Sequence, residues 1–222
     1  ELSVARSASV VDPLPEGVGG RLGLPALGRA IAGLHRPESL EEAATARRRL
    51  VFDEFFLFSL AVLRQRAAQA VRPGIAFDAP GRLAAGAQAA LPFALTAGQR
   101  RALEAIWRDM AAPTPMQRLL QGDVGSGKTV VAFLAALTAV GSGYQAAIMA
   151  PTEILADQHA ERLAALAEPL GVPVVPITSG MGAARRRAAL ERLAAPQPCL
   201  AVGTHALLEA DVAFYRLGFV VV

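Results

Sequence analysis

The amino-acid sequence predicts an α/β fold: a parallel sheet with helices on both faces, preceded by a helical segment that contains one long helix. Two observations lead to this prediction. From residue 91 onwards, short apolar runs alternate with segments of helical pattern, which is typical of sheets built from strand–helix–strand units. Before Pro73, a long stretch contains neither glycine nor proline, and it far exceeds the usual length of a strand.

The composition excludes several classes of protein. The chain has 222 residues, of which 53% are hydrophobic, so it is too apolar to be disordered and long enough for one domain and a smaller piece. A net charge of +3 permits nucleic-acid binding without requiring it. Cys199 is the only cysteine, which excludes an internal disulfide and favours a small buried strand residue. Neither a membrane span nor a signal peptide is evident, so we expect a cytoplasmic protein.

The N-terminal part reads as helical. A short helix is predicted over residues 25–34, and a long one begins after Ser39, which forms a capping-box pattern with Glu42. The long helix carries more apolar residues than one stripe needs, so we expect it to pack against a second body as well as its own neighbours. These apolar residues are Leu50, Phe55, Leu57, Phe58, Ala61 and Val62. The Gly/Ala/Pro-rich stretch that follows, residues 73–90, is predicted to be a linker.

The C-terminal part supplies the strands. We predict them over residues 117–121, 145–150, 172–177, 199–203 and 218–222, with helices between most of them. The last predicted strand, LGFVVV, coincides with the end of the sequence. We therefore expect the sequence to be a piece of a longer protein.

One glycine-rich stretch of the sequence matches a motif whose chemistry is known. The residues 122–129 read GDVGSGKT and fit the pattern G-x-x-x-x-G-K-[ST], between a predicted strand and a gap-free helix. Glycines let the backbone N–H groups converge on phosphate oxygens, and the helix N-terminus adds partial positive charge. The predicted phosphate-binding loop consists of Gly122, Asp123, Val124, Gly125, Ser126, Gly127, Lys128 and Thr129, with Thr129 as a magnesium ligand.

Lys128 is the only lysine of the chain, and arginine supplies every other permanent positive side-chain charge. A lysine of this motif reaches between two phosphates as a compact charge on a thin stem. The planar guanidinium of arginine would not fit the same space. The chemistry of the loop therefore explains why a lysine is kept at this one position.

The sequence on either side of the loop indicates which class of P-loop protein this chain resembles. LPFALTAGQRRALEAIWRDM precedes it, with Thr96 as N-cap and Gln99 in the first turn of a helix, while MAPTEILADQH and VGTHALL follow later strands. Together these motifs resemble the first RecA-like lobe of superfamily 2 helicases, and in particular the RecG-type branched-DNA helicases. The resemblance extends upstream through LHRPESLEEAATARRRLVFDEFFLF and covers most of the chain.

The resemblance implies an ATP site with magnesium, in which Lys128 and Thr129 are the catalytic residues. The upstream residues that match the adenine-contacting motif are Phe93, Leu95, Thr96 and Gln99. An amide such as that of Gln99 can both donate to and accept from a base edge. Alternatively, Gln99 is a plain exposed residue of a first helical turn.

The same resemblance implies a DNA-binding face. The matching positions are Pro151, Thr152, Glu153, Thr178, Gly180, Gly203, Thr204 and His205. A hydroxyl and a helix N-terminus suit a phosphate, but Pro-Thr-Glu is equally a good helix start, and a lone histidine is more often a hydrogen-bonded turn residue. The arginines 185–187 fit a solvated helix face better than a phosphate clamp. His35 and His159 lack any metal-ligand spacing.

The resemblance also divides the chain into a helical connector after a wedge domain (1–72), a linker (73–90) and helicase lobe 1 (91–222), truncated before a D-E-x-H motif. That motif, a second lobe and most of the wedge are expected outside the sequence. We therefore expect this segment by itself to lack ATP turnover.

The implied function is a part in an ATP-dependent DNA helicase that remodels stalled forks and Holliday junctions in recombination and repair. Branched DNA is the implied partner, with single-strand DNA-binding protein as a further candidate and no membrane. The nearest alternative is lobe 1 of another translocase, such as a transcription-repair coupling factor or a replication-restart helicase. An alternative from another class is a P-loop ATPase or kinase that does not act on nucleic acid.

Overall fold

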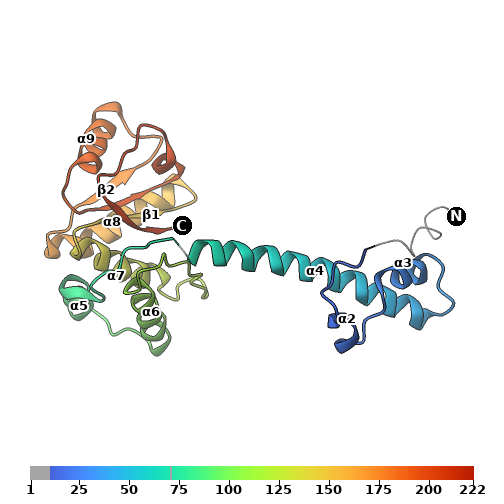
Figure 1. Cartoon of the computed structure of the whole chain (residues 1–222). Helices are drawn as coiled ribbons and strands as arrows, with labels where there is room; N and C mark the ends of the chain where they lie inside the picture. The colour runs from blue at the N-terminus through green and yellow to red at the C-terminus, as the bar shows by residue number, and fades with distance from the viewer. Residues whose placement is uncertain (1–10, 71) are drawn as a thin grey trace. The chain divides into compact units, whose positions relative to one another are not determined.

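The structure, a computed structural model, describes residues 11–70 and 72–222. The chain forms two compact units, an N-terminal unit (Glu1–Val71) and an α/β unit (Arg72–Val222). The helices and strands of both units are drawn in Figure 1. Among the described residues, no helix combines the length and the apolar character that a bilayer span requires.

In its described residues, the N-terminal unit contains helices α2 (Val18–Arg21), α3 (Leu27–His35) and α4 (Leu40–Ala70). The two longer helices confirm the prediction from sequence, and α3 packs against α4. Gly33 allows a close approach here, because a Cβ at this position would lie 3.2 Å from Cγ of Glu42. The Oγ of Ser39 accepts a hydrogen bond from the Glu42 N–H (3.1 Å), as predicted. The second half of the capping box differs, since the Glu42 carboxylate accepts from the N–H of Glu38 and not from that of Ser39.

A buried arginine joins the parts of this unit. The side chain of Arg49, on α4, is only 1% exposed, and its Nε donates to Oδ1 of Asp53 at 2.9 Å. The two terminal nitrogens donate to the carbonyl oxygen of Pro25 and to Oδ1 of Asp12. The bond from Arg49 is the main reason that the pKa of Asp12 falls to about 2. One guanidinium therefore fastens the segment before α2 and the start of α3 to the long helix.

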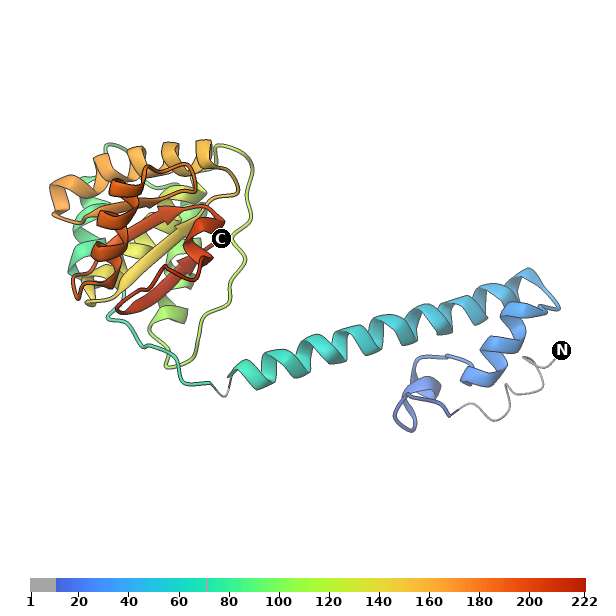
Figure 2. The same cartoon turned by 90° about the horizontal axis from the view of Figure 1, so that it is seen from above.

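The α/β unit contains α5 (Gly81–Ala90), α6 (Ala97–Met110), α7 (Lys128–Gly141), α8 (Glu153–Ala167) and α9 (Ala183–Ala194). Its strands are β1 (Gln145–Met149), β2 (Val174–Ile177), β3 (Leu200–Gly203) and β4 (Leu217–Val221), with short 3-10 turns η2 (Glu168–Leu170) and η3 (His205–Leu208). The sheet order is β2-β3-β1-β4, and every pair is parallel. Figure 2 shows the strands side by side between the helices. These strands confirm four of the five predicted from sequence.

Alternate residues of the strands pack on opposite faces of the sheet. Ile148 and Val202 belong to the larger core, which is shared with helices α5 to α8. Ala147 and Ala201 belong to a smaller core under α9, which also includes the buried Cys199. Helices thus cover both faces, as the sequence predicts. Burial raises the pKa of the Cys199 thiol, in keeping with a structural rather than a nucleophilic residue.

The predicted linker, residues 73–90, is in part a packed helix. Helix α5 contacts α7, and its Ala84 and Ala87 are buried. The two helices come close because Gly141 on α7 faces Leu83: a Cβ at Gly141 would lie 3.0 Å from Cβ of Leu83. The small residues that suggested a flexible linker instead permit close helix packing. The boundary between the two units falls earlier, at residues 71 and 72.

The predicted strand over residues 117–121 is wrong in this structure. This segment has no regular secondary structure and pairs with no strand, and β4 is the edge of the described four-stranded sheet. Residues 116–120 and the residues of β4 line a common pocket of about 500 Å³. A strand requires a ladder of backbone hydrogen bonds, and the pocket separates this segment from the edge where such a ladder would form.

We expect the Arg49→Ala variant to lose about 3–5 kcal/mol of stability in the N-terminal unit, because it leaves the buried carboxylate of Asp53 unpaired. Amide hydrogen exchange in α3 as a function of urea measures this loss. The matched control is Arg48→Ala at the exposed neighbouring position, which we expect to change stability by less than about 0.5 kcal/mol. Equal protection of α3 in the two variants would contradict the assigned role of Arg49.

Candidate nucleotide site and nucleic-acid face

The glycine-rich loop leads directly into α7, whose N-cap is Gly127. Gly125 and Gly127 have φ angles of 80° and 82°, in the left-handed region that other L-residues rarely adopt. Within the described part of the chain, the N–H groups of Gly125, Gly127, Lys128 and Thr129 donate to no protein oxygen. Unpaired N–H groups at the start of a helix are the usual backbone arrangement for holding an anion.

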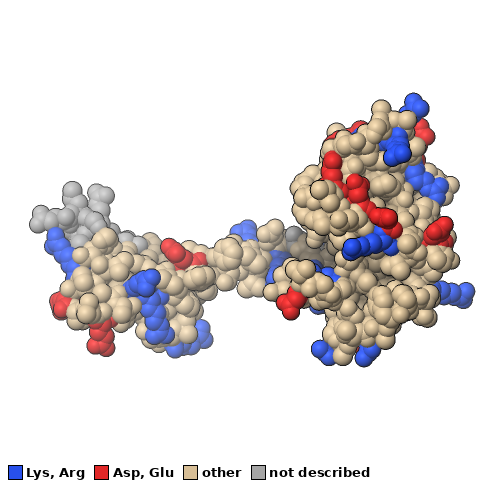
Figure 3. All heavy atoms as spheres, turned by 180° about the vertical axis from the view of Figure 1, so that it is seen from behind, with Lys and Arg blue, Asp and Glu red and all other residues tan. Residues whose placement is uncertain are grey.

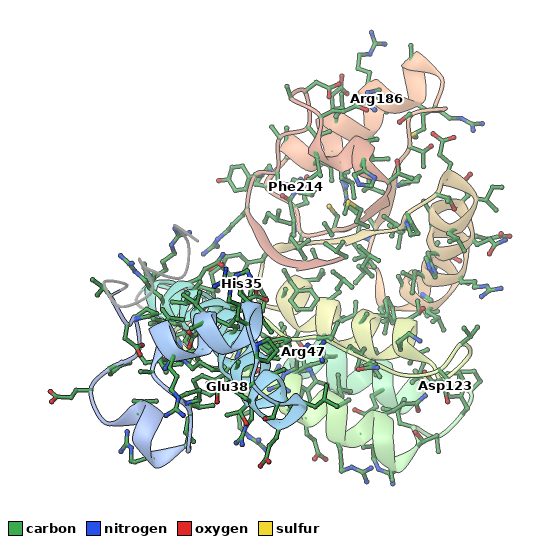
Figure 4. All side chains as sticks on the ribbon, turned by 90° about the vertical axis from the view of Figure 1, so that its right-hand side faces the viewer. His35, Glu38, Arg47, Asp123, Arg186 and Phe214 are labelled. Atoms are coloured by element: carbon green, nitrogen blue, oxygen red, sulfur yellow. The ribbon has the colours of Figure 1, made fainter. Side chains whose placement is uncertain are left out.

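The side chain of Lys128 folds back over this loop. Its Nζ donates to the carbonyl oxygens of Gly122 (2.6 Å) and Asp123 (2.8 Å). Figure 4 shows Asp123 on the loop that leads into α7. Gly122 is packed closely, because a Cβ there would lie 2.8 Å from Oγ of Ser126. The predicted loop residues are therefore brought together around a single ammonium group.

The upstream motif contacts the loop directly. Thr96 and Gln99 form a complete capping box at the start of α6. The Nε2 of Gln99 also donates to the carbonyl oxygen of Ser126 at 2.8 Å. Gln99 is thus not a plain first-turn residue, because its amide connects α6 to the phosphate-binding loop. Of the other residues of this motif, Leu95 is buried and Phe93 is about half exposed.

The pocket beside the loop contains a residue that sequence reasoning did not single out as functional. Lys128, Thr129, Pro151 and His159 all line this pocket. The Nδ1 of His159 is buried and has no hydrogen-bond partner. No sequence pattern marks this residue, because its position depends on α8 lying against the sheet. Among the described residues, no group of His, Cys, Asp and Glu side chains is arranged to hold a metal ion.

The residues predicted to face DNA gather at one edge of the sheet. Pro151–Glu153 follow β1, Thr178 and Gly180 follow β2, and Gly203–His205 lie at the end of β3. Because these parallel strands are neighbours in the order β2-β3-β1, their carboxyl ends meet at the same edge. The hydrogen bond from the Thr204 N–H to the Ile177 carbonyl oxygen continues the ladder beyond β3.

The threonines of this edge are not equivalent. Thr178 and Thr204 are each 6% exposed, whereas Thr152 is exposed. The Oγ1 of Thr152 caps α8 by accepting from the Leu155 N–H (3.3 Å). His205, like Thr152, is exposed and available to a ligand.

The arginine row at the start of α9 is divided by ion pairing. Arg186 donates to Glu209 (2.7 Å) and to Asp211 (2.8 Å), whereas Arg185 and Arg187 are exposed. The bond from Arg186 lowers the pKa of Asp211, and Asp211 raises that of Arg186. Arg186 therefore holds the segment after η3 rather than acting as a phosphate clamp. Figure 4 shows Arg186 on α9 and Phe214 in that segment.

A family model described as DEAD/DEAH box helicase matches residues 96–222, which is more than half of the chain. The chain belongs to this helicase family. Membership of this family implies nucleotide binding, which agrees with the geometry of the loop at Lys128.

This helicase chain is similar to named relatives over almost its whole length. It is 46% identical to the ATP-dependent DNA helicase RecG of Synechocystis sp. over 97% of this chain, and 44% identical to RecG of Bacillus subtilis over 96%. A solved structure of RecG bound to a three-way DNA junction matches with a TM-score of 0.85 at 37% identity, covering 96% of this chain. The chain spans only 26%, 31% and 29% of the length of these relatives. The predicted RecA-like fold and the resemblance to RecG are confirmed.

We expect Gly127→Ala to weaken nucleotide binding, because its Cβ would lie 2.3 Å from Nε2 of Gln99. The flexible amide must then move away and lose its hydrogen bond to the Ser126 carbonyl oxygen. Gly143→Ala is the matched control: Gly143 has a similar φ of 83°, but a Cβ there meets nothing within 4 Å. Both variants should lose about 1–2 kcal/mol of stability from the left-handed conformation. Only Gly127→Ala should lose affinity when a fluorescent ATP analogue is titrated, and equal affinities would contradict the proposed contact.

Proposed function

We propose that this chain is the nucleotide-binding part of an ATP-dependent DNA helicase that remodels branched DNA, such as stalled forks and Holliday junctions, in recombination and repair. The observation that carries the proposal is one pocket lined both by Lys128 and Thr129 and by Pro151, the first residue of the predicted DNA-facing segment. The similarity to RecG bound to a three-way junction supports the choice of branched DNA. In this proposal the α/β unit is lobe 1 and the N-terminal unit is the connector that follows the wedge domain.

The proposed nucleotide is ATP with magnesium. The unpaired N–H groups of the loop and the ammonium of Lys128 fit the phosphates, and the hydroxyl of Thr129 fits as one oxygen ligand of magnesium. Bound magnesium would supply positive charge to the phosphate oxygens. Lys128 stabilises the charge that develops on the terminal phosphoryl group during transfer. The adenine would lie against the half-exposed Phe93, with Thr96 and Gln99 beside it, whereas the buried Leu95 would support this segment from inside.

The proposed DNA contacts lie at the carboxyl edge of the sheet. Phosphate oxygens suit the exposed N-terminus of α8 at Thr152, the exposed tip at Gly180 and the exposed His205. Thr178 and Thr204 are buried, so they contribute through the shape of their loops. On the face that Figure 3 shows, basic and acidic side chains are scattered among broad neutral areas. The net charge is only +3, so a few phosphate contacts, rather than a large basic surface, would carry the binding.

In the proposed mechanism, nucleotide binding and release alternate the grip of the Thr152 and Thr204 loops on duplex DNA. The Thr152 loop adjoins the phosphate-binding loop, since Pro151 shares a pocket with Lys128. A movement of the Lys128 ammonium group on nucleotide binding would therefore shift the residue of the DNA-facing edge that lines the same pocket. Single-strand DNA-binding protein as a partner and a cytoplasmic location, both expected from the sequence, are further parts of this proposal.

A kinase or ATPase without a nucleic-acid role is the weaker candidate, because the chain belongs to a helicase family. Lobe 1 of another DNA translocase would share the same loop and the same sheet edge. The similarity to RecG helicases at 46% and 44% identity favours the branched-DNA enzyme over that alternative.

We expect the chain to bind ATP weakly in the presence of magnesium, and Lys128→Ala to weaken that binding at least about tenfold. Lys128→Arg should fail as well, because a guanidinium does not fit the space of the ammonium. Isothermal titration calorimetry measures both. The matched control is Arg118→Ala, which removes another cation of the same pocket that is already paired with Asp109. If Lys128→Ala binds ATP like the parent, the phosphate-binding assignment is wrong.

We expect the chain to bind a three-way DNA junction weakly and without regard to sequence, with affinity falling steeply as salt rises. Contacts to phosphates release counterions. A plot of the logarithm of the binding constant against the logarithm of the salt concentration should therefore have a slope of about −0.9 for each phosphate contacted. Fluorescence anisotropy over a salt series measures this slope. His205→Ala should bind more weakly, whereas His35→Ala in the N-terminal unit should not. A sequence-specific, salt-insensitive complex would contradict the proposal.

A further inference from the structure

We propose that Glu153 does not itself contact DNA and instead positions the DNA-facing edge. In this inference, which rests on the proposed DNA-binding function, its carboxylate ties the loop after β2 to the start of α8. The two loops then meet DNA as one unit. Glu153 is a positioning residue that acts through Gly180.

The geometry of the contact is direct. Oε1 of Glu153 accepts a hydrogen bond from the N–H of Gly180 at 2.8 Å, between residues 27 positions apart in the sequence. The second oxygen also lies against this residue, because a Cβ at Gly180 would be 3.0 Å from Oε2. Glycine at position 180 thus lets the whole carboxylate group approach the backbone of the loop.

Without this contact, the negative charge of Glu153 would be unfavourable on a face that is proposed to bind DNA. A carboxylate aimed at a DNA phosphate would repel it, yet Glu153 is exposed beside Thr152, at the edge where DNA is proposed to bind. As the first residue of α8, the carboxylate is stabilised by the positive end of the helix dipole. Its hydrogen bond to a backbone N–H is also charge-assisted, and therefore stronger than a neutral one.

The loop after β2 has few other anchors at its tip. Thr178 is buried, and the Met181 N–H donates to its carbonyl oxygen, but Ser179 and Gly180 are exposed. Helix α9 then begins after Gly182 without a side-chain cap. Within the described residues, Glu153 is the one hydrogen-bond partner from another element that holds this tip.

The sheet order shows which strands are affected by the tether between Glu153 and Gly180. The strands β1 and β2, whose loops it joins, are not neighbours, because β3 lies between them. One hydrogen bond therefore brackets the end of β3, where Gly203 and Thr204 lie. Ladder hydrogen bonds hold the end of β3 itself, from the Thr204 N–H to the Ile177 carbonyl oxygen and from the Ala150 N–H to the Gly203 carbonyl oxygen. The tether adds the two outer loops to this set.

The test compares three variants of the full chain by anisotropy with the three-way junction. Glu153→Ala should bind about three- to tenfold more weakly, although it removes a negative charge from a face that meets a polyanion. Glu153→Gln keeps an oxygen that accepts from Gly180, so it should bind within about twofold of the parent. The matched control is Asp157→Ala, which removes an exposed carboxylate one turn further along α8 and should not weaken binding.

A second measurement needs no DNA. Amide hydrogen exchange at Gly180 should be at least about tenfold faster in Glu153→Ala than in the parent, while Glu153→Gln and Asp157→Ala retain the parent rate. The salt dependence adds a third readout, because displacement of the loop removes a phosphate contact and lowers the slope by about 0.9.

The outcomes separate this inference from the proposed function. If the parent does not bind the junction, the DNA-binding proposal fails, while exchange at Gly180 still decides whether the tether exists. Unchanged exchange in Glu153→Ala overturns the tether. Tighter DNA binding by Glu153→Ala, or a Glu153→Gln variant as weak as Glu153→Ala, overturns the positioning role, because the charge itself would then determine the affinity.

Discussion

The burial of α7 is the constraint on which the α/β unit depends. From Phe133 to Val140 the side chains of this helix are buried on all sides, against the sheet, α5 and α6. An apolar helix of this kind is stable only when it is enclosed, and each fully buried large side chain contributes about 1.5–3 kcal/mol. The enclosed body fixes where the helix begins. Lys128 and the left-handed turn at Gly125 and Gly127 are therefore held in place by packing several residues away.

The two ends of the sheet are held by different kinds of polar contact. Away from the proposed ligand edge, the buried Gln145 side chain donates to the Leu193 carbonyl (2.8 Å) and accepts from the Arg216 N–H (3.0 Å). Such a satisfied buried network rigidifies the fold. At the ligand edge, the contacts of Gln99 and Glu153 are exposed. Exposed hydrogen bonds open more easily than buried ones, so this edge is the less rigid end of the sheet.

The N-terminal unit is also held by a buried polar network, at whose centre is a charged side chain, that of Arg49. Arg49 satisfies three acceptors at once, so its burial depends on each of them. Further along α4 the apolar side chains of Phe55 and Phe58 are 67% and 68% exposed. The expectation that this helix packs against a second body therefore stays a prediction.

The sequence by itself determined what depends on neighbouring residues: the helix starts at Ser39, Thr96 and Thr152, the alternation of strands and helices, and the loop around Lys128. Only the tertiary structure decided that the stretch 73–90 contains a packed helix, that residues 117–121 lie outside the sheet and that Thr178 and Thr204 are buried. It also decided that Gln99 meets Ser126 and that Glu153 meets Gly180. Periodicity and capping report on the local backbone. Burial, strand pairing and contacts between distant residues depend on which elements meet, and no local pattern encodes that.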